Sequence, residues 1–331
     1  MFYRLSVRVI ARCFIGLLIL PILLCAQEKK PCWLRDATSP APATAYLLCE
    51  QGGIWSTTDS GATWVPLSTG STEHHRAFAW LDAKRGVAVG NGGMVLATED
   101  GGKTWQPRVS GVKEHLMDVA FVGESGWIVG YQGVILHSVD GGKTWARQAT
   151  QTSMTLESVF FLDKDHGWSV GWSGTILRTV DGGKTWSVIK VPAAQWTLTA
   201  LCFTDLNNGW VTGFAGQLLR SKDGGVTWTA QKSPIQNWLT SIAFDNAGRG
   251  WITYDDGLLL SEDKGETWKP VPAGGRYFLG KLLLMDKSLW AIGQSVVLQQ
   301  SGTGKEWTKN PNLVAERTLT EAELAAKAQA K

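Results

Sequence analysis

The chain has 331 residues, of which 44% are hydrophobic and 18% are charged, and this balance excludes a largely disordered protein. It contains 18 Trp and 38 Gly, a composition that favours β-structure with many tight turns. The formal net charge of +3 comes from Arg4, Arg8 and Arg12, because the chain beyond residue 26 holds 29 basic and 29 acidic residues. Such a neutral chain lacks the basic surface typical of nucleic-acid-binding proteins.

Residues 1–26 have the pattern of a secretory signal peptide, with three arginines before the apolar run 14–24 and the small residue Ala26 at the expected cleavage site. The uncharged stretch 13–26 has 14 residues, fewer than the roughly 20 that a helix needs to span a bilayer. We therefore expect export to a periplasmic, lumenal or extracellular compartment. A retained membrane anchor and a lipid-modified Cys25 are the alternatives.

Cys32 and Cys49 lie 17 residues apart in the expected exported chain. They could form a disulfide in an oxidising compartment. Such a bridge would stabilise the fold by about 3 kcal/mol on the loop-entropy model. The sequence leaves open whether they pair.

One eight-residue motif recurs at nearly constant spacing. The copy at 138–145 reads Ser-Val-Asp-Gly-Gly-Lys-Thr-Trp, and successive motif tryptophans are 41, 40, 41, 42, 40 and 39 residues apart. The last copy, at 301–307, lacks the aspartate. We interpret the six Asp-box aspartates as structural, since an aspartate accepts hydrogen bonds from turn amides and glycines supply positive φ. They are Asp59, Asp100, Asp140, Asp181, Asp223 and Asp263.

A second motif, Gly-Trp-x-Val-Gly at 126–130, recurs in step with the first, and its tryptophan precedes the Asp-box tryptophan by 17 or 18 residues. Helical periodicity is absent. In the third repeat we expect four short strands, at 116–122, 127–131, 134–139 and 145–149. Four strands in about 40 residues are typical of a propeller blade. The sequence therefore predicts an all-β protein, a seven-bladed β-propeller of four-stranded antiparallel blades over residues 27–310.

The two ends of the repeat array differ from its middle. The first inner strand is expected near 32–38, where Pro31, Pro40 and Pro42 crowd the segment. Because proline is tolerated only at strand ends and edges, this strand is either short or held by the Cys32–Cys49 bridge. The tail 311–331 contains a helix-capping box at 320–323 and predicts a short helix.

These repeats resemble the photosystem II stability/assembly factor family of BNR-repeat propellers. The resemblance rests on the unit Gly-Trp-x-Val-Gly followed by Leu-x-Thr-x-Asp-Gly-Gly-Lys-Thr-Trp and covers residues 32–310. The Asp-box alone is shared with sialidases, other glycosidases and sortilin-type receptors. The resemblance implies a non-enzymatic propeller that binds membrane-protein assembly intermediates, in photosynthetic cells those of photosystem II.

Propeller geometry places the Asp-boxes on one face, so binding is expected on the opposite face, where loops on a rigid scaffold carry function. Aromatic side chains at its turn tips suit a peptide, a sugar or a protein surface, although each could simply cover the neighbouring blade. The candidate binding residues are His74, His75, Arg76, His115, Tyr131, Trp172, Trp196, Phe214, Trp238, Tyr254, Arg276 and Tyr277. Asn91 and Asp255 are expected at two further tips.

Three functions remain open from the sequence. We expect a monomeric, non-enzymatic scaffold for a protein partner, with no catalytic residues, metal, cofactor or nucleic acid. A sialidase-like glycosidase would need three arginines, a tyrosine nucleophile and an acid, for which Arg76, Arg276, Tyr254 or Tyr277, and Asp255 or Glu157 are available. A third arginine is lacking, because Arg178 and Arg220 follow the strand that leads to the Asp-box face. A carbohydrate-binding propeller is the third possibility.

Overall fold

The computed structural model describes residues 29–50, 52–285, 288–301, 306–313 and 316–318. The expected signal peptide and the helix expected from Thr320 lie outside these residues and stay predictions. The chain divides into a unit Lys30–Arg317 and a second unit formed by Met1–Lys29 with Thr318–Lys331. No helix in the described part is long and apolar enough to cross a membrane.

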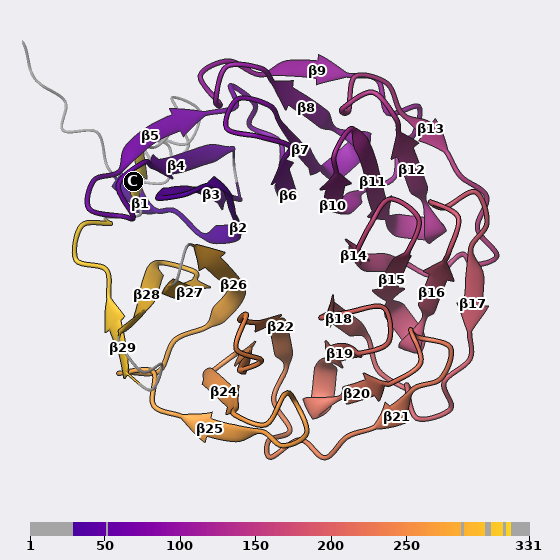
Figure 1. The fold of residues 1–331 in the computed structure, drawn as a ribbon. Helices are drawn as coiled ribbons and strands as arrows, with labels where there is room; N and C mark the ends of the chain where they lie inside the picture. Colours follow the sequence, from indigo (N-terminus) through magenta and orange to yellow (C-terminus); the bar gives the residue numbers. More distant parts are fainter. Residues whose placement is uncertain (1–28, 51, 286–287, 302–305, 314–315, 319–331) are drawn as a thin grey trace, which may run out of the picture. The chain divides into compact units, whose positions relative to one another are not determined.

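Seven four-stranded antiparallel sheets are arranged in a ring with their first strands innermost, as Figure 1 shows. Each sheet consists of four strands that are consecutive in sequence, so blade 1 is β2–β5 and blade 7 is β26–β29. A separate two-stranded sheet pairs β1 (Lys29–Pro31) with β30 (Glu316–Thr318). The seven-bladed propeller predicted from the repeat is confirmed.

The strands of equivalent position have similar lengths around the ring. The inner strands are β2 (Leu34–Ala41), β6 (His75–Trp80), β10 (Leu116–Val122), β14 (Leu156–Phe161), β18 (Leu198–Phe203), β22 (Leu239–Phe244) and β26 (Leu279–Met285). The second strands are β3 (Thr44–Cys49), β7 (Gly86–Gly90), β11 (Ser125–Gly130), β15 (Gly167–Gly171), β19 (Gly209–Gly213), β23 (Gly250–Tyr254) and β27 (Ser288–Gly293).

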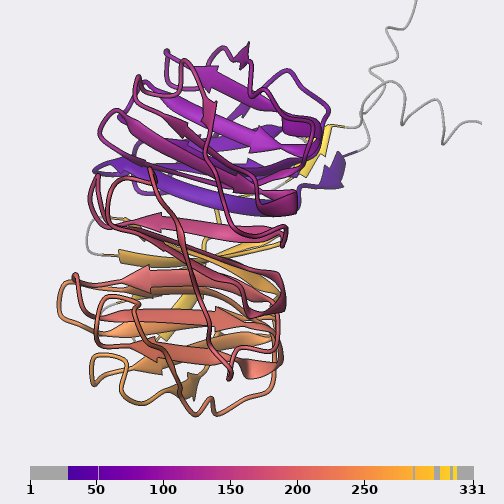
Figure 2. The same ribbon diagram turned by 90° about the vertical axis from the view of Figure 1, so that its right-hand side faces the viewer.

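The third strands are β4 (Gly53–Thr57), β8 (Val95–Thr98), β12 (Ile135–Ser138), β16 (Ile176–Thr179), β20 (Leu218–Ser221), β24 (Gly257–Ser261) and β28 (Val296–Ser301). The outer strands are β5 (Val65–Ser68), β9 (Gln106–Arg108), β13 (Ala146–Arg147), β17 (Ser187–Ile189), β21 (Thr229–Ala230), β25 (Lys269–Val271) and β29 (Glu306–Lys309). Four single-turn 3₁₀ helices join second to third strands: η1 (Asn91–Gly93), η2 (Tyr131–Gly133), η3 (Trp172–Gly174) and η4 (Phe214–Gly216). Figure 2 shows the strands running between two faces that are formed by the connections.

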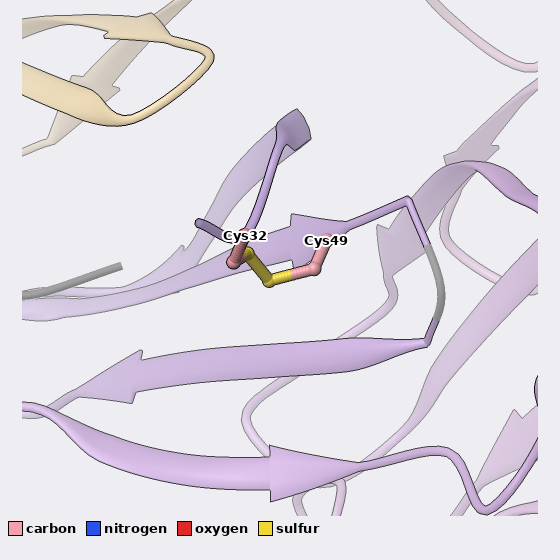
Figure 3. Close-up of a disulfide and its surroundings, with 2 residues drawn as sticks. All are labelled: Cys32 and Cys49. Atoms are coloured by element: carbon pink, nitrogen blue, oxygen red, sulfur yellow. A yellow bond between two sulfur atoms is a disulfide. The ribbon is translucent and has the colours of Figure 1, made fainter. Parts of the chain in front are cut away.

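The first blade contains the disulfide that the sequence left open. Cys32 and Cys49 are bonded, with 5.6 Å between their Cα atoms, and Figure 3 shows the bridge between the start of β2 and the end of β3. The inner strand extends beyond the expected stretch and includes Pro40, at a register irregularity between Thr38 and Ala41. Proline is accommodated there because the ladder is interrupted.

The Asp-box turns are held by side-chain hydrogen bonds within each motif. The Asp140 carboxylate accepts hydrogen bonds from the amide and hydroxyl of Thr144, at 3.0 and 2.6 Å. The Ser138 hydroxyl donates to Asp140 and accepts from the Gly142 amide, both at 2.8 Å. Gly141 and Gly142 adopt φ of 72° and 81°, values that favour glycine. The same threonine-to-aspartate bonds occur at Asp59, Asp100, Asp181, Asp223 and Asp263.

The tryptophan of the Gly-Trp motif packs against the following blade, as in blades 3 and 4. The Trp168 indole is 1% exposed, stacks on Phe203 with ring centroids 3.6 Å apart, and donates to the Gly224 carbonyl of the following Asp-box at 3.0 Å. Trp127 makes the equivalent contacts with Phe161 and Gly182. The two sequence motifs recur in step because the tryptophan of one blade contacts the Asp-box of the next blade. The hydrophobic core lies at these interfaces between blades.

Candidate functional site

Seven equivalent backbone hydrogen bonds build the face opposite the Asp-boxes. In each blade the residue after the second strand donates its amide to the carbonyl of the residue before the inner strand, over 2.9 to 3.3 Å. We call the donors the turn ring: Glu50, Asn91, Tyr131, Trp172, Phe214, Asp255 and Gln294. We call the acceptors the rim ring: Trp33, His74, His115, Thr155, Thr197, Trp238 and Phe278. Each blade thus presents two side chains at fixed, equivalent places.

A β-bulge supplies a third side chain from each blade. In all seven inner strands the register shifts between the first and third residues, for example between Leu156 and Ser158. A bulge re-aims the side chain of the extra residue, here the second of the strand. We call these residues the floor ring: Arg35, Arg76, Met117, Glu157, Thr199, Thr240 and Gly280.

A pocket of about 440 Å³ lies where residues of the three rings meet, at the beginning of the inner strands. We call it the mouth pocket. All seven floor residues line it, together with Leu34. From the rim ring it takes Trp33, Thr197, Trp238 and Phe278, and from the turn ring Tyr131, Trp172, Phe214 and Gln294.

The charged residues of the mouth pocket belong to blades 1, 2 and 4. The Trp172 indole donates to Oε1 of Glu157 at 2.5 Å, and Arg76 Nε donates to Oδ1 of Asn91 at 3.0 Å. Burial raises the pKa of Glu157 above its usual range, while the Trp172 hydrogen bond, Arg76 and Arg35 oppose that shift. Among the residues that line the pocket, two guanidinium groups face one carboxylate, and the excess positive charge is reduced by Glu50, which acts on Arg35 from beside the pocket.

Six aromatic side chains contribute to the remaining wall. Phe214 and Trp238 stack with centroids 4.6 Å apart and 11° between their planes, and Trp238 meets Phe278 edge-on at 5.6 Å. Trp33 and Trp172 are 52% and 43% exposed. Large aromatic groups that remain this open suit contact with a partner.

Glycines at the end of the second motif and at the end of η3 allow close contacts with neighbouring carbonyl groups. At Gly171, the last residue of β15, a Cβ atom would overlap the Thr155 carbonyl oxygen of the rim ring. At Gly174, φ is +67° and a Cβ would overlap the Ala194 carbonyl. These close approaches explain why both positions carry glycine.

Five of the twelve candidate binding residues line the mouth pocket: Arg76, Tyr131, Trp172, Phe214 and Trp238. His75 does not reach the surface: it is fully buried as the first residue of β6, with Nε2 3.0 Å from the Thr69 hydroxyl and Nδ1 2.7 Å from the Glu73 carbonyl. His75 occupies the first position of its inner strand, where the other six inner strands have a core leucine.

The other six candidates lie outside the pocket wall. Tyr254 and Tyr277 pack against hydrophobic clusters, and Arg276 pairs with Asp256 at 2.7 Å. Trp196 is 56% exposed and precedes the rim ring by one residue. His74 lies 3.5 Å from Glu50. His115 lines a separate hollow of about 920 Å³ together with Arg108 and Arg147.

The structure does not bring the proposed glycosidase residues together. Arg76 and Glu157 line the mouth pocket, whereas Arg276 and both tyrosines do not. Arg178 donates to the Gly224 carbonyl of an Asp-box. Across the described residues, no group of three or more His, Cys, Asp and Glu side chains is placed to hold a metal ion.

Four lining residues were not predicted from the sequence, and Glu157 was expected only as a glycosidase acid. The four are Trp33, Arg35, Met117 and Phe278. All of these occupy rim or floor positions. The signal that identifies them is positional, because each lies immediately before, or second in, an inner strand. An alignment of the seven repeats on their inner strands would place them in the same two columns.

Solved structures similar to this chain share the propeller fold. YCF48 bound to D1 peptide has a TM-score of 0.62 and 22% identity, covering 74% of this chain and 83% of its own. YCF48 from Cyanidioschyzon merolae has a TM-score of 0.62 and 22% identity, covering 76% and 90%. An ancestral GH74 enzyme has a TM-score of 0.65 at 13% identity, covering 86% and 47%. No curated protein sequence matches the chain significantly.

A family model described as Photosynthesis system II assembly factor YCF48 matches the chain three times, at residues 65–157, 148–230 and 186–277. These overlapping matches extend over more than half of the chain and contain the second to sixth Asp-boxes. The sequence resemblance to assembly-factor propellers is confirmed. The chain belongs to the Photosynthesis system II assembly factor YCF48 family.

Proposed function

We propose that this protein is a non-enzymatic assembly scaffold that binds an extended segment of a protein partner in the mouth pocket. The observation that carries the proposal is that six aromatic residues and two arginines share one pocket wall. Aromatic residues and arginine dominate the binding energy of protein interfaces. The family relationship to YCF48, which has been solved bound to D1 peptide, supports a protein segment as the ligand.

The size of the mouth pocket favours a segment rather than a folded surface. Its volume of about 440 Å³ falls in the range of sites that hold small ligands, so only a few residues of a partner fit inside. The backbone groups of the rim and turn rings already bond to each other. Recognition would therefore rest on side chains more than on added β-strand pairing.

The signal-like segment 1–26 supports the further proposal that the scaffold acts after export, beside a membrane where assembly intermediates reside. Fractionation of cells that express the full chain tests this point. We expect the protein in the periplasmic, lumenal or extracellular fraction, with residues 1–26 removed. Recovery in the cytoplasm with an intact N-terminus would contradict it.

Peptide binding can be tested with two probes: synthetic 15-residue peptides that tile D1, and a phage-displayed library of random twelve-residue peptides. Fluorescence anisotropy then gives the affinity of each selected peptide for the wild type and for two tryptophan variants. Trp172→Ala removes an aromatic wall of the pocket, and we expect at least about a tenfold loss of affinity. Trp196→Ala removes a more exposed tryptophan outside the pocket, and we expect no loss.

Three results would overturn the proposal. The wild type retains no peptide from either probe, or both tryptophan variants lose affinity equally, which would place binding elsewhere. Turnover of a fluorogenic sialoside or another aryl glycoside by the wild type would contradict the non-enzymatic role.

A further inference from the structure

We infer that the part of the mouth pocket formed by blades 5 to 7 is an anchor pocket that takes one bulky apolar side chain, aromatic or large aliphatic, from the bound segment. We define the anchor pocket by its walls and floor: Phe214, Trp238, Phe278, Thr199, Thr240 and Gly280. The inference rests on the proposed function, because it names what the same pocket selects.

The floor ring has short side chains only in these three blades. Its members in blades 1 to 4 are long side chains, whereas blades 5 to 7 carry Thr199, Thr240 and Gly280. Because all seven positions share the same bulge, side-chain size decides the depth at each of them. A Cβ atom at Gly280 would have no heavy atom within 4 Å. The space above Gly280 is therefore free for a guest side chain.

The chemistry of the anchor pocket is apolar. The hydroxyl of Thr199 donates to the Leu239 carbonyl, and that of Thr240 donates to the Leu279 carbonyl, each at 2.6 Å. Both hydroxyl protons therefore already form hydrogen bonds within the protein. The walls above them are three aromatic rings, of which Trp238 contacts both Phe214 and Phe278. An apolar side chain loses no hydrogen bond on entering such a site and gains from leaving water.

The rest of the mouth pocket contains the charged residues, in contrast to the apolar anchor pocket. Its charged residues, Arg35, Arg76 and Glu157, all lie outside the anchor pocket and carry excess positive charge. A polypeptide segment can contact both parts at once. A large apolar side chain of the segment would enter the anchor pocket of blades 5 to 7, and an acidic group of the segment would lie in the charged part. This separation of apolar and charged surfaces favours a segment with that pattern over a uniformly polar chain.

The test begins with the displayed twelve-residue library selected on the full chain. We expect the enriched peptides to share one aromatic, Leu or Met position. Replacing that residue by Ala in a fluorescein-labelled peptide should weaken binding to the wild type by roughly 10- to 100-fold, the effect of burying one large apolar side chain.

Two substitutions at Gly280 separate the anchor from the rest of the site. Gly280→Met fills the space with the side chain that blade 3 carries at the equivalent position, so the strand conformation accommodates it. We expect this variant to bind the parent peptide roughly 10- to 100-fold more weakly and to be indifferent to the Ala replacement in the peptide. Gly280→Ala leaves most of the space open and should stay within about threefold of the wild type. Thermal unfolding of both variants verifies that the fold is intact.

The possible failures are distinguishable. Peptides that bind without any apolar preference, or a preference unchanged in Gly280→Met, would overturn the anchor pocket and leave the proposed function standing. Absence of all peptide binding to the wild type would overturn both. Oligosaccharide binding that Gly280→Met abolishes would show that the space receives a sugar instead and would also overturn the inference.

Discussion

The ammonium of Lys281 lies 2.7 Å from Oδ1 of Asp36, and this contact joins the last blade to the first. The same carboxylate accepts the amides of Ala37 and, from blade 2, Phe78. The side chain of Asp36 is 6% exposed, and that of Lys281 is 37% exposed. Burial lowers the pKa of Lys281, but Asp36 and Asp118 outweigh that effect and raise it overall. One buried carboxylate therefore links three blades where the ring closes.

Lys281→Met should lower the free energy of unfolding by about 2–3 kcal/mol. It removes the charge that balances Asp36, and the expected cost lies between that of an exposed pair and the ~3–5 kcal/mol of a fully buried one. Urea denaturation measures the change. The double variant Lys281→Met with Asp36→Asn should recover part of the loss, because the amide keeps an acceptor for Phe78 without the charge. Additive effects of the two single substitutions would contradict the coupling.

Reduction of the Cys32–Cys49 bridge should lower the free energy of unfolding by about 3 kcal/mol, because the 17-residue separation constrains the unfolded chain. Urea curves with and without dithiothreitol measure this difference. Cys32→Ala with Cys49→Ala should match the reduced wild type and show no further response to the reductant. A Cys202→Ala control should respond like the wild type, since Cys202 takes no part in the bridge. An unchanged midpoint on reduction of the wild type would refute the prediction.

Ser138→Ala should cost about 1–3 kcal/mol, because it leaves the buried Gly142 amide without its acceptor. Ser138→Thr is the matched control and should be nearly neutral, since other Asp-boxes use a threonine hydroxyl for the same bond, as at Thr98 and Thr179. The melting temperatures of the two variants decide the matter. Equal losses for Ala and Thr would mean that side-chain size, not the hydrogen bond, sets the requirement.

The Asp-boxes should make the fold acid-sensitive between pH about 4 and about 2. The backbone amide and the hydroxyl of Thr104 both donate to Asp100 and hold its pKa at about 2. Because this folded value lies below that of an unfolded aspartate, the contribution is present above pH about 4 and is lost as the pH falls through about 2. Burial raises the pKa of Asp118 and Glu157 instead, so their contribution has the opposite sign and changes at higher pH.

Thermal unfolding across pH 5 to 2 measures this dependence. The pKa of Asp59, Asp140 and Asp263 is also about 2, so the effect should sum over several blades. Asp100→Asn should reduce the pH dependence of the melting temperature by the contribution of one Asp-box. A melting temperature that stays level between pH 4 and pH 2 would show that these carboxylates do not govern acid stability.

The fold was predictable because its two motifs repeat at a fixed interval, and each copy marks the same turn. The turn-ring aromatics Tyr131, Trp172 and Phe214 were predictable for the same reason, since they directly follow the motif glycine. Of the rim and floor residues, only His74, His115, Trp238 and Arg76 were named as binding candidates, because no motif marks where an inner strand begins. His75 illustrates this: a shift of one residue separates a surface position from the core. Arg35 was not predicted as a floor residue, because the prolines around the first inner strand obscure where that strand begins.

Each blade of this ring is one uninterrupted stretch of chain, and no blade borrows a strand from the other end of the sequence. A gene segment of about forty codons therefore encodes a whole blade, with its own rim, turn and floor residues. Tandem duplication or loss of such a segment would change the circumference of the ring without breaking any sheet. Within a fixed ring, exchanging one segment would replace one sector of the mouth pocket and leave the other six sectors in place.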